Sequence, residues 1–524
     1  MNTQEIQMAS PTTVYRLPCS PTQRCLDRFS VLEDADGLED DNGHVPVWHL
    51  LQHLLDTSPV ADGRQLADLL ETIAITLRDT TGAATDYGLL KDMVGTVDDK
   101  TYGNFFETCW PRIRSLALSM PALFPNGTLP LLGSTVLSRP QVACLLAHQF
   151  LCTLSAPLPR RSDYFDFSIW FGSEQRHPEA VRIYLTTLFK YFSKLPDRAT
   201  HSTEAAQVLE ATHVDISYCL TTLSPEPSAA AQHSNILLSP IQIHLVSEYD
   251  TSPASLGLPH GAAVVSANRV IGFGESATQE EIHVGCSPEA CPAVLIAPEL
   301  QESQILVVRG AKAVSNIVGQ RRGVRLREES FRGPQSGSGN DDVADVDWGS
   351  RTMLFMDALE LDSPEQYSHP GDVQEQELPG GQIDLPDLVP RNMDREIAKA
   401  RLAFSSGTYH EIVSPLWGCG AFNGDPFVKV LLLWIAASTA AAAQTGLYIG
   451  EEKQSKPAAP ALRIVCDQGL RDIADRMSRL VRLAGTQCST VGELRGLLEA
   501  VPKDTKKFET GEWLLAKLSS ARIQ

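Results

Sequence analysis

The sequence predicts an α/β protein in which an all-helical region precedes a sheet covered by helices. From His49 to about Lys194, apolar residues recur at three- and four-residue steps, which is the spacing of amphipathic helices. From about Ser239, short apolar runs alternate with helical stretches, as expected for helices packed on a largely buried sheet. Hydrophobic residues make up 43% of the 524 residues, an ordinary share for a globular chain that can bury a large core.

Three parts follow one another along the chain. Residues 1–45 are expected to form an extended arm, because they contain scattered prolines and the acidic patch EDADGLEDD. Residues 46–235 form the predicted helical region, where Ser138 shortly before Pro140 is typical of a helix start. Residues 236–524 form the predicted sheet region. Its expected strands are IQIHLVSEY, AAVVSAN, ILVVRG, TMLFMDAL, EIVSP and LYIG, and its expected helices include NMDREIAKARLAF, GLRDIADRMSRLVRLA and TVGELRGLLEAV.

Acidic residues are concentrated in one segment of this sheet region. Residues 341–390 contain thirteen Asp and Glu and one Arg, in a chain whose formal net charge is −20. Few large apolar residues accompany them. We therefore predict a solvated acidic insertion at about residues 333–388, with solubility as its expected role.

Residues 430–449 are about long enough to span a bilayer, but they are rich in alanine, interrupted by polar residues and without flanking basic clusters. A buried helix running into a buried strand is the prediction here. The first residues lack a basic start and an apolar core, so no secretion signal is expected. Eleven cysteines without a CxxC pair or a zinc-site spacing indicate reduced thiols, an intracellular compartment and no structural metal.

Two Gly-rich loops follow strand-like runs in the sheet region. They are IGFGES after AAVVSAN, and WGCGAFNGD, residues 417–425, after EIVSP. The second loop leads into the long apolar helix, so its backbone N–H groups would favour an anionic group such as phosphate. Tight turns are the alternative explanation, and the pattern leaves both open.

Glu280 and Glu281 follow the first loop and are adjacent in sequence. Neighbouring residues diverge on a strand or a helix, so the two cannot face each other across a scissile bond as in ordinary glycosidases. One of them can still act as a single acid/base beside a bound diphosphate. The alternative is a helix start that places Glu in its first turn, where it complements the helix dipole.

SANRVIGFGESATQEEI followed by WGCGAFNGD resembles the catalytic domain of poly(ADP-ribose) glycohydrolases, whose signature is three glycines, a short spacer and Gln-Glu-Glu. FFETCWPRIRSLALSMPALFPNGTLPLL, LSRPQVACLLAHQFLCTL and YLTTLFKYFSKL resemble the helical region of that family, and TMLFMDAL, LVPRNMDREIAKARLAF and TVGELRGLLEAV its later elements. The resemblance implies a macrodomain, a three-layer α/β/α fold, preceded by a helical accessory region. It also implies hydrolysis of ribose–ribose O-glycosidic bonds in poly(ADP-ribose), without a metal or a cofactor.

Site residues carried over from the resemblance have distinct roles. Glu281 is implied as the catalytic acid/base, and Glu280 as its neighbour contacting ribose. The implied ligand-binding residues are Asn268, Gly272, Gly274, Gln279, Gly418, Cys419, Gly420, Ala421, Phe422, Asn423, Gly424 and Tyr448. Residues 418–424 are expected to hold the diphosphate through backbone N–H groups, which also explains how an acidic protein binds a polyanion.

The sequence departs from the family pattern at several positions. Phe273 stands where a glycine is expected, and Val265 where the family commonly has Asp. The stacking phenylalanine of the family falls on Ile449, with Tyr448 beside it as a substitute. These departures support an alternative function, a macrodomain that binds ADP-ribose with little or no hydrolase activity. A helical scaffold with a purely structural macrodomain is the third possibility, and the complete Gln-Glu-Glu triplet favours the hydrolase.

The expected partners follow from the implied activity. They are poly(ADP-ribose), ADP-ribose and ADP-ribosylated proteins, with no membrane and no sequence-specific nucleic acid. We expect a monomer in the nucleus, the cytoplasm or both, with a role in the DNA damage response.

Overall fold

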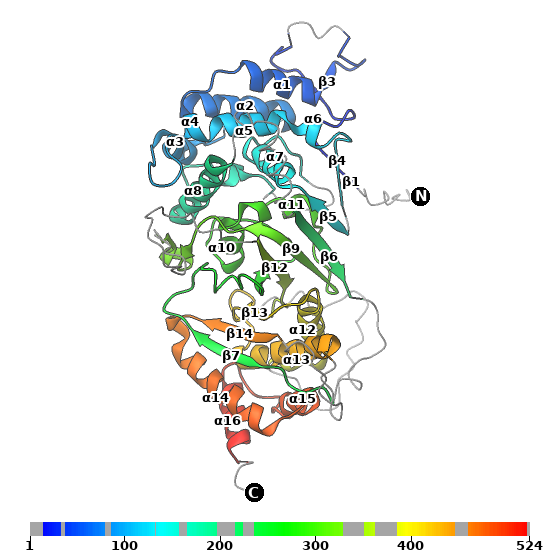
Figure 1. The fold of residues 1–524 in the computed structure, drawn as a ribbon, viewed down its shortest axis with the longest axis vertical. Helices are drawn as coiled ribbons and strands as arrows, with labels where there is room; N and C mark the ends of the chain where they lie inside the picture. The colour runs from blue at the N-terminus through cyan, green and yellow to red at the C-terminus, as the bar shows by residue number, and fades with distance from the viewer. Residues whose placement is uncertain are drawn as a thin grey trace, which may run out of the picture. The chain divides into compact units, whose positions relative to one another are not determined.

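The protein was analysed as a computed structural model. It describes residues 14–32, 37–78, 85–131, 133–156, 165–195, 215–223, 235–327, 350–361, 385–445 and 460–520. The chain forms two compact units (Figure 1), which are described separately. Unit 1 comprises Met1–Tyr218, Gly272–Glu275 and Pro288–Glu299, and unit 2 comprises Cys219–Ile271, Ser276–Ser287 and Leu300–Gln524.

Unit 1 is mainly helical, as predicted. Its α-helices are α1 (Val47–Thr57), α2 (Gly63–Arg78), α3 (Gly88–Gly95), α4 (Phe105–Thr108), α5 (Trp110–Leu118), α6 (Met120–Leu123), α7 (Arg139–Phe150), α8 (Pro178–Lys194) and α11 (Ala293–Ile296). Its short strands are β1 (Val14–Arg16), β2 (Arg24–Leu26), β3 (His44–Pro46), β4 (Thr128–Pro130) and β5 (Ser134–Leu137). β1 pairs with β4 and β2 with β3, both antiparallel.

The start of α7 confirms the predicted helix start. The Ser138 backbone N–H donates to Gln141 Oε1 at 2.9 Å, and the Ser138 hydroxyl accepts from the Gln141 N–H, which is a capping box. Pro140 lies in the first turn, where its missing N–H costs no helical hydrogen bond. Local sequence therefore fixes where this buried helix begins.

Unit 2 contains a mixed sheet. Its strands follow the order β6 (Ile216–Thr222), β9 (Gln304–Lys312), β12 (Ser350–Asp357), β8 (Ala262–Ala267), β13 (Glu411–Ser414), β14 (Ala461–Cys466) and β7 (Ile241–Leu245). The chain passes from unit 1 to unit 2 within β6. β12, β8, β13, β14 and β7 run parallel to one another, whereas β9 is antiparallel to β12. A two-stranded sheet joins β10 (Ile317–Val318) and β11 (Arg325–Leu326).

The central strands bury both faces of this sheet. Successive residues of a strand point to opposite faces, so the register defines two rows of side chains. One row belongs to the main hydrophobic cluster and consists of Val264, Leu354 and Val307. The other row lies outside that cluster, is at most 1% exposed and consists of Val265, Phe355 and Leu306. Both faces are therefore covered.

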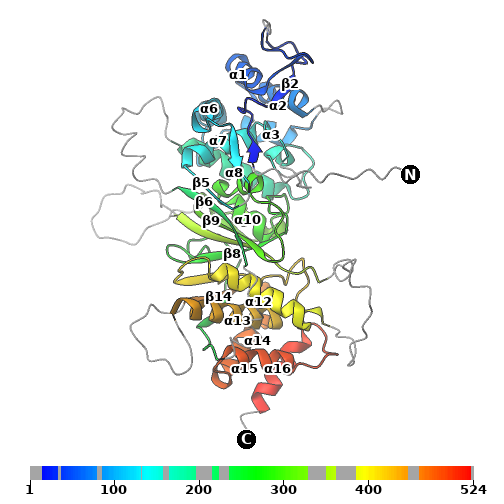
Figure 2. The same ribbon diagram turned by 90° about the vertical axis from the view of Figure 1, so that its right-hand side faces the viewer.

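Helices of unit 2 supply these covers. The main hydrophobic cluster includes residues of α12 (Pro390–Phe404), α13 (Pro426–Thr445), α14 (Arg471–Gln487), α15 (Val491–Glu499) and α16 (Glu509–Ser520). Figure 2 shows α12 beside α13, and the two helices are in contact. α10 (Gln279–Gly285) contacts β8, and its His283 Nδ1 accepts a hydrogen bond of 2.7 Å from Arg351 of β12. Because the apolar residues of α10 lie outside the main cluster, α10 covers the second face, and the predicted three-layer α/β/α arrangement is confirmed.

α13 covers most of the segment that is long enough to span a bilayer. Among the described residues it is the helix long and apolar enough to cross a bilayer, yet 94% of the segment Pro426–Gln444 is buried inside the structure, as a core helix is. The predicted buried helix is thus confirmed. The strand predicted at LYIG lies outside the described residues. Of the range predicted as an acidic insertion, residues 350–361 and 385–388 are described, and β12 occupies Ser350–Asp357.

Candidate functional site

The start of α10 holds the side chain of Glu281. Thr278 caps the helix, and its hydroxyl accepts from the Glu281 N–H. In return, Glu281 Oε2 accepts from the backbone N–H of Thr278 at 2.8 Å and of Ser276 at 3.1 Å. This capping box gives Glu281 a structural role. Its other oxygen, Oε1, has no hydrogen-bond partner among the described residues, so it is available to a ligand.

Gln279 binds the backbone of β8. β13 pairs with β8 only at Ala262 and Ala263. Beyond these two residues, the backbone groups of β8 that point toward β13 have no strand partner. The Gln279 carboxamide takes their place, because its Oε1 accepts from Ser266 N at 2.7 Å and its Nε2 donates to Val264 O at 2.8 Å. A carboxamide offers both a donor and an acceptor, which two consecutive backbone groups of one edge require. Gln279 therefore fixes α10 against the sheet.

Glu280 binds the loop that follows β8. The Glu280 side chain is 9% exposed, and its Oε2 accepts from the Asn268 N–H at 2.9 Å. The Asn268 side chain turns back on its own loop, where its Oδ1 accepts from Val270 N at 3.1 Å. The structure thus brings Asn268, Gln279, Glu280 and Glu281 together. Each residue of the Gln-Glu-Glu triplet holds a different stretch of backbone.

In the first Gly-rich loop, residues Gly272–Glu275 belong to unit 1. Phe273 is 2% exposed, and its ring lies 5.0 Å from that of Phe167 and 5.2 Å from that of Trp170, between ring centroids. Trp170 Nε1 also donates to the backbone oxygen of Gly274 at 2.9 Å. The bulky side chain that stands in place of the expected glycine is therefore a core residue. A Cβ added at Gly272 meets no atom within 4 Å, so packing does not require a glycine there.

Residues 418–424 form a turn between β13 and α13. The Trp417 indole before them is buried and donates to Met356 O at 2.9 Å. Gly418 has φ +76° and Asn423 φ +59°, and the Gly424 N–H donates to Gly418 O at 2.9 Å. A side chain at Gly418 would meet Ala358 Cβ at 2.7 Å in addition to this unfavourable φ. Gly418 is therefore required by the fold of the turn.

The tip of this turn exposes backbone donors. The N–H groups of Gly420, Ala421 and Phe422 have no acceptor within the described part of the chain, and Gly420 and Ala421 are exposed. Consecutive N–H groups before a long helix favour an anion. A Cβ added at Gly420 meets nothing within 4 Å, in contrast to Gly424, where it would meet Lys429 Cε at 2.5 Å. The open side of the turn is thus at Gly420.

Buried charges lie beneath the turn. Lys429 of α13 is 1% exposed and pairs with Glu396, and its Nζ lies 3.5 Å from Asp387 Oδ1. Asp387 Oδ2 accepts from the Asp425 N–H at 2.9 Å. Burial raises the pKa of Asp387 to about 6, although Lys429 opposes this shift. These charges hold the end of the turn against α12 and α13. Burial also raises the pKa of the Cys419 thiol, which disfavours a thiolate in the turn.

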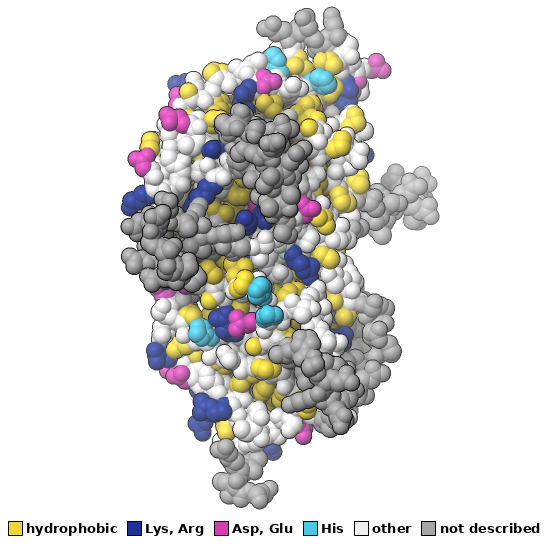
Figure 3. All heavy atoms as spheres, in the orientation of Figure 1, with side chains coloured by type: hydrophobic (Ala, Val, Ile, Leu, Met, Phe, Trp, Pro, Cys, Tyr) yellow, Lys and Arg dark blue, Asp and Glu magenta, His cyan; other side chains and the backbone are white. Residues whose placement is uncertain are grey.

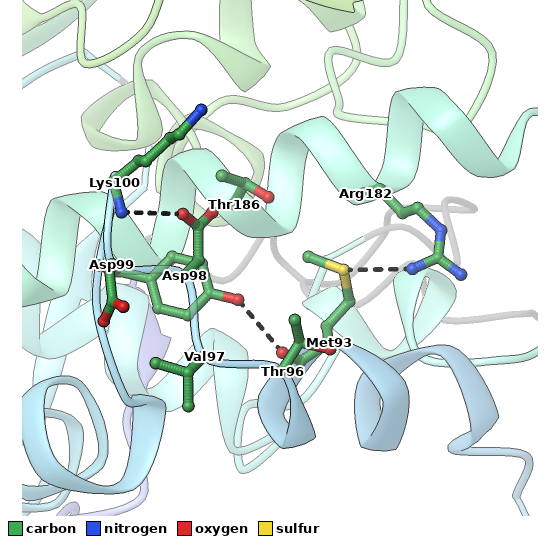
Figure 4. Close-up of a pocket in the computed structure, with 9 residues that line it drawn as sticks. Met93, Thr96, Val97, Asp98, Asp99, Lys100, Arg182 and Thr186 are labelled. Atoms are coloured by element: carbon green, nitrogen blue, oxygen red, sulfur yellow. Dashed lines mark hydrogen bonds between the residues drawn. The ribbon is translucent and has the colours of Figure 1, made fainter.

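A pocket in unit 1 contains none of the predicted site residues. It has a volume of about 480 Å³ and lies between the end of α3 and α8 (Figure 4). Arg182 points into it and donates to Met93 Sδ at 3.5 Å. The residues lining it are Met93, Thr96, Val97, Asp98, Asp99, Lys100, Tyr102, Arg182 and Thr186. The predicted Tyr448 lies outside the described residues.

Two ranges of the chain match descriptions of known protein domains. Residues 97–210 match the family described as "Poly (ADP-ribose) glycohydrolase (PARG), helical domain", and residues 256–455 match "Poly (ADP-ribose) glycohydrolase (PARG), Macro domain fold". "Poly(ADP-ribose) glycohydrolase 1" of Caenorhabditis elegans is 24% identical over 343 residues, which are 63% of this chain and 38% of that relative. A helical domain followed by a macrodomain defines the class of this protein. Since the two matched ranges together cover more than half of the chain, it belongs to the poly(ADP-ribose) glycohydrolase family.

One solved structure was also compared. It is a point mutant of the poly(ADP-ribose) glycohydrolase from Deinococcus radiodurans in complex with ADP-ribose. It has 13% sequence identity and a TM-score of 0.28, and the match covers 55% of this chain and 100% of that chain.

Proposed function

We propose that this protein hydrolyses the ribose–ribose O-glycosidic bonds of poly(ADP-ribose) and releases ADP-ribose, with Glu281 as a single acid/base. Family membership supports the substrate class. The position of Glu281 supports the role of the residue, because its Oε2 is held by two backbone N–H groups while Oε1 has no partner among the described residues. A carboxyl group fixed in this way can direct one oxygen at a bound sugar.

The proposed reaction uses the carboxyl group twice. Protonated Glu281 donates its proton to the departing ribose hydroxyl while the bond from that oxygen to the anomeric carbon breaks. The carboxylate then stabilises the positive charge at the anomeric carbon, and water adds to this carbon and returns a proton to Glu281. General acid/base help of this kind contributes about 10²- to 10⁴-fold. Backbone N–H groups of residues 420–422 are proposed to bind the diphosphate and to position the substrate.

Binding without hydrolysis is the second candidate function, and one observation favours it. The capping box explains why a glutamate stands at position 281 without any catalytic role, because Glu at this helix position is common in such boxes. A reader of ADP-ribose would also need the exposed N–H groups of residues 420–422. The two candidates differ in turnover.

Replacing Glu281 by Gln separates them. Gln also completes capping boxes, so Glu281→Gln keeps the helix start and removes the acid. We expect release of ADP-ribose from poly(ADP-ribose), followed by chromatography, to fall at least about 100-fold, with the affinity for ADP-ribose unchanged within a few fold. Glu493→Gln is a matched control, because Glu493 completes the same box with Thr490 at the start of α15.

Each outcome selects one candidate. Full activity in Glu281→Gln would refute the acid/base role. A wild-type protein that binds ADP-ribose but releases none from the polymer would be a reader. If the wild-type protein neither binds ADP-ribose nor releases it from the polymer, the remaining possibility is a helical scaffold with a purely structural macrodomain. We further propose ADP-ribosylated proteins as partners, a monomeric state, a nuclear or cytoplasmic location and a role in the DNA damage response, for which imaging of the tagged chain after DNA damage is the first test.

A further inference from the structure

The segment between α15 and α16 contacts the candidate diphosphate turn. Lys507 Nζ donates to Asn423 Oδ1 at 2.6 Å, and the Phe508 N–H donates to Asp425 Oδ2 at 2.7 Å. The Thr510 hydroxyl donates to the same Asp425 oxygen at 2.8 Å. The turn and this segment are more than eighty residues apart in sequence, so the contact is produced by the fold alone.

Asp425 holds the two segments in fixed positions. Its side chain is fully buried, and its Oδ1 accepts from Phe427 N at 2.9 Å and Val428 N at 3.0 Å, which caps α13. Its Oδ2 holds Phe508 and Thr510 at the start of α16. One carboxylate therefore fixes both helix starts, and with them the position of Lys507 beside the turn.

Lys507 carries a charge without a counter-ion. It is partly exposed, and it forms no ion pair with a carboxylate among the described residues. Its Nζ lies 5.1 Å from the centroid of the Phe508 ring, and the uncharged Asn423 oxygen accepts from it. The other lysine of the turn's surroundings, Lys429, is buried and paired with Glu396. Lys507 is thus a cation at the turn that can exchange a neutral acceptor for an anionic one.

Phe508 has an unfavourable backbone conformation. Its φ is +70°, which is rare for a residue with a bulky side chain, and the residue is 45% exposed. Such conformations cost energy and occur mainly where the surrounding structure enforces them, often at functional sites. Here the Phe508 N–H donates to the buried Asp425 carboxylate, and the Phe508 ring lies beside the Lys507 ammonium group.

We propose that Lys507 is a ligand-binding residue that donates to the diphosphate of ADP-ribose bound at the N–H groups of residues 420–422. This inference rests on the proposed function. A diphosphate carries two negative charges, and a chain with a formal net charge of −20 offers it no general attraction. On the face drawn in Figure 3, Lys and Arg side chains lie in separate small groups among acidic and apolar ones. A single cation next to the turn therefore adds to the attraction of the backbone N–H groups, and Lys507 occupies that position.

Calorimetric titration of the full chain with ADP-ribose and with adenosine tests this proposal. In Lys507→Gln, the affinity for ADP-ribose should fall about 10- to 100-fold, because a charge-assisted hydrogen bond is lost. Affinity for adenosine, which has no phosphate, should stay within about twofold of wild type. Lys507→Arg should restore most of the ADP-ribose affinity, since it keeps a cationic donor.

Lys506→Gln is the matched control. Lys506 is the exposed neighbour, its backbone N–H donates to Glu509, and the substitution makes the same change in net charge. Equal ADP-ribose affinities for Lys506→Gln and Lys507→Gln would overturn the proposal while the proposed function stands. An equal loss for ADP-ribose and adenosine would reduce Lys507 to a structural role and also overturn it. A wild-type chain that does not bind ADP-ribose would remove the proposed function and this inference together.

Discussion

A substitution at Gly420 tests whether the turn of residues 418–424 binds the diphosphate, without disturbing the fold of this turn. A Cβ at this position meets no atom within 4 Å, and the residue does not have a positive φ. Gly420→Val should therefore leave the free energy of unfolding within about 0.5 kcal/mol of wild type. The valine side chain would instead occupy the open side of the turn, where the N–H groups of residues 420–422 have no acceptor in the described part of the chain.

The expected loss of affinity follows from these donors. A hydrogen bond to a charged group contributes about 1.5 to 3 kcal/mol, and a side chain at Gly420 blocks the approach of phosphate to at least one of the three N–H groups. The affinity for ADP-ribose should fall about 10- to 150-fold. Gly420→Ala should show a smaller loss, because one methyl group covers less of the turn.

Calorimetry and chemical denaturation check the two halves of this prediction separately. Gly424→Ala is the comparison, because its Cβ would lie 2.5 Å from Lys429 Cε and 2.9 Å from Gly418 O. We expect that variant to lose about 1 to 3 kcal/mol of stability. Normal ADP-ribose affinity in Gly420→Val, with an intact fold, would refute the diphosphate turn.

Two further predictions concern stability. Phe273→Ala should lower the free energy of unfolding by about 3 to 5 kcal/mol, because the Phe273 ring packs on Phe167 and Trp170. Phe29→Ala is the control and should have little effect, because Phe29 is 50% exposed. Equal denaturation midpoints for the two variants would contradict the core role of Phe273. Asp387 has a pKa raised from 3.8 to about 6 in the folded protein, so its contribution to stability is largest below pH 3.8 and is lost as the pH rises through 6. The free energy of unfolding of Asp387→Asn, measured in urea, should therefore rise relative to that of wild type by up to about 3 kcal/mol between pH 4 and 6. A stability difference between variant and wild type that stays constant across this pH range would exclude the raised pKa of Asp387.

Much of the fold could be predicted because its signals are local. The runs around Ala262–Ala267, Gln304–Lys312 and Ser350–Asp357 are short and apolar, and they form the buried centre of the sheet. β6 and β14 were missed. β6, with the sequence ISYCLTT, mixes polar and apolar residues, and β14, with the sequence ALRIVC, includes an arginine. Neither sequence shows a continuous apolar run or a strict alternation of apolar and polar residues, so the signal for a strand is weak.

The candidate site was predicted only in part. The Gln-Glu-Glu triplet and the second glycine loop are continuous in sequence, so their residue types could be interpreted together. Asp425, immediately before Pro426, has the local pattern of a helix cap and could have been found. Lys507 and Phe508 could not, because their contacts with the turn join residues 84 and 83 positions apart and no local periodicity encodes such a contact.

Each residue of the triplet has a structural role in the fold. Gln279 uses both ends of its carboxamide on β8, Glu280 uses one oxygen on the loop after it, and Glu281 uses one oxygen on its own helix start. A glutamate that caps a helix has one oxygen fixed by backbone N–H groups, which orients the second oxygen without further support. The helix-start and acid/base interpretations of Glu281 are therefore compatible, because the first positions the group that the second requires. A substitution that keeps the cap while removing the acid, Glu281→Gln, therefore separates hydrolase from reader.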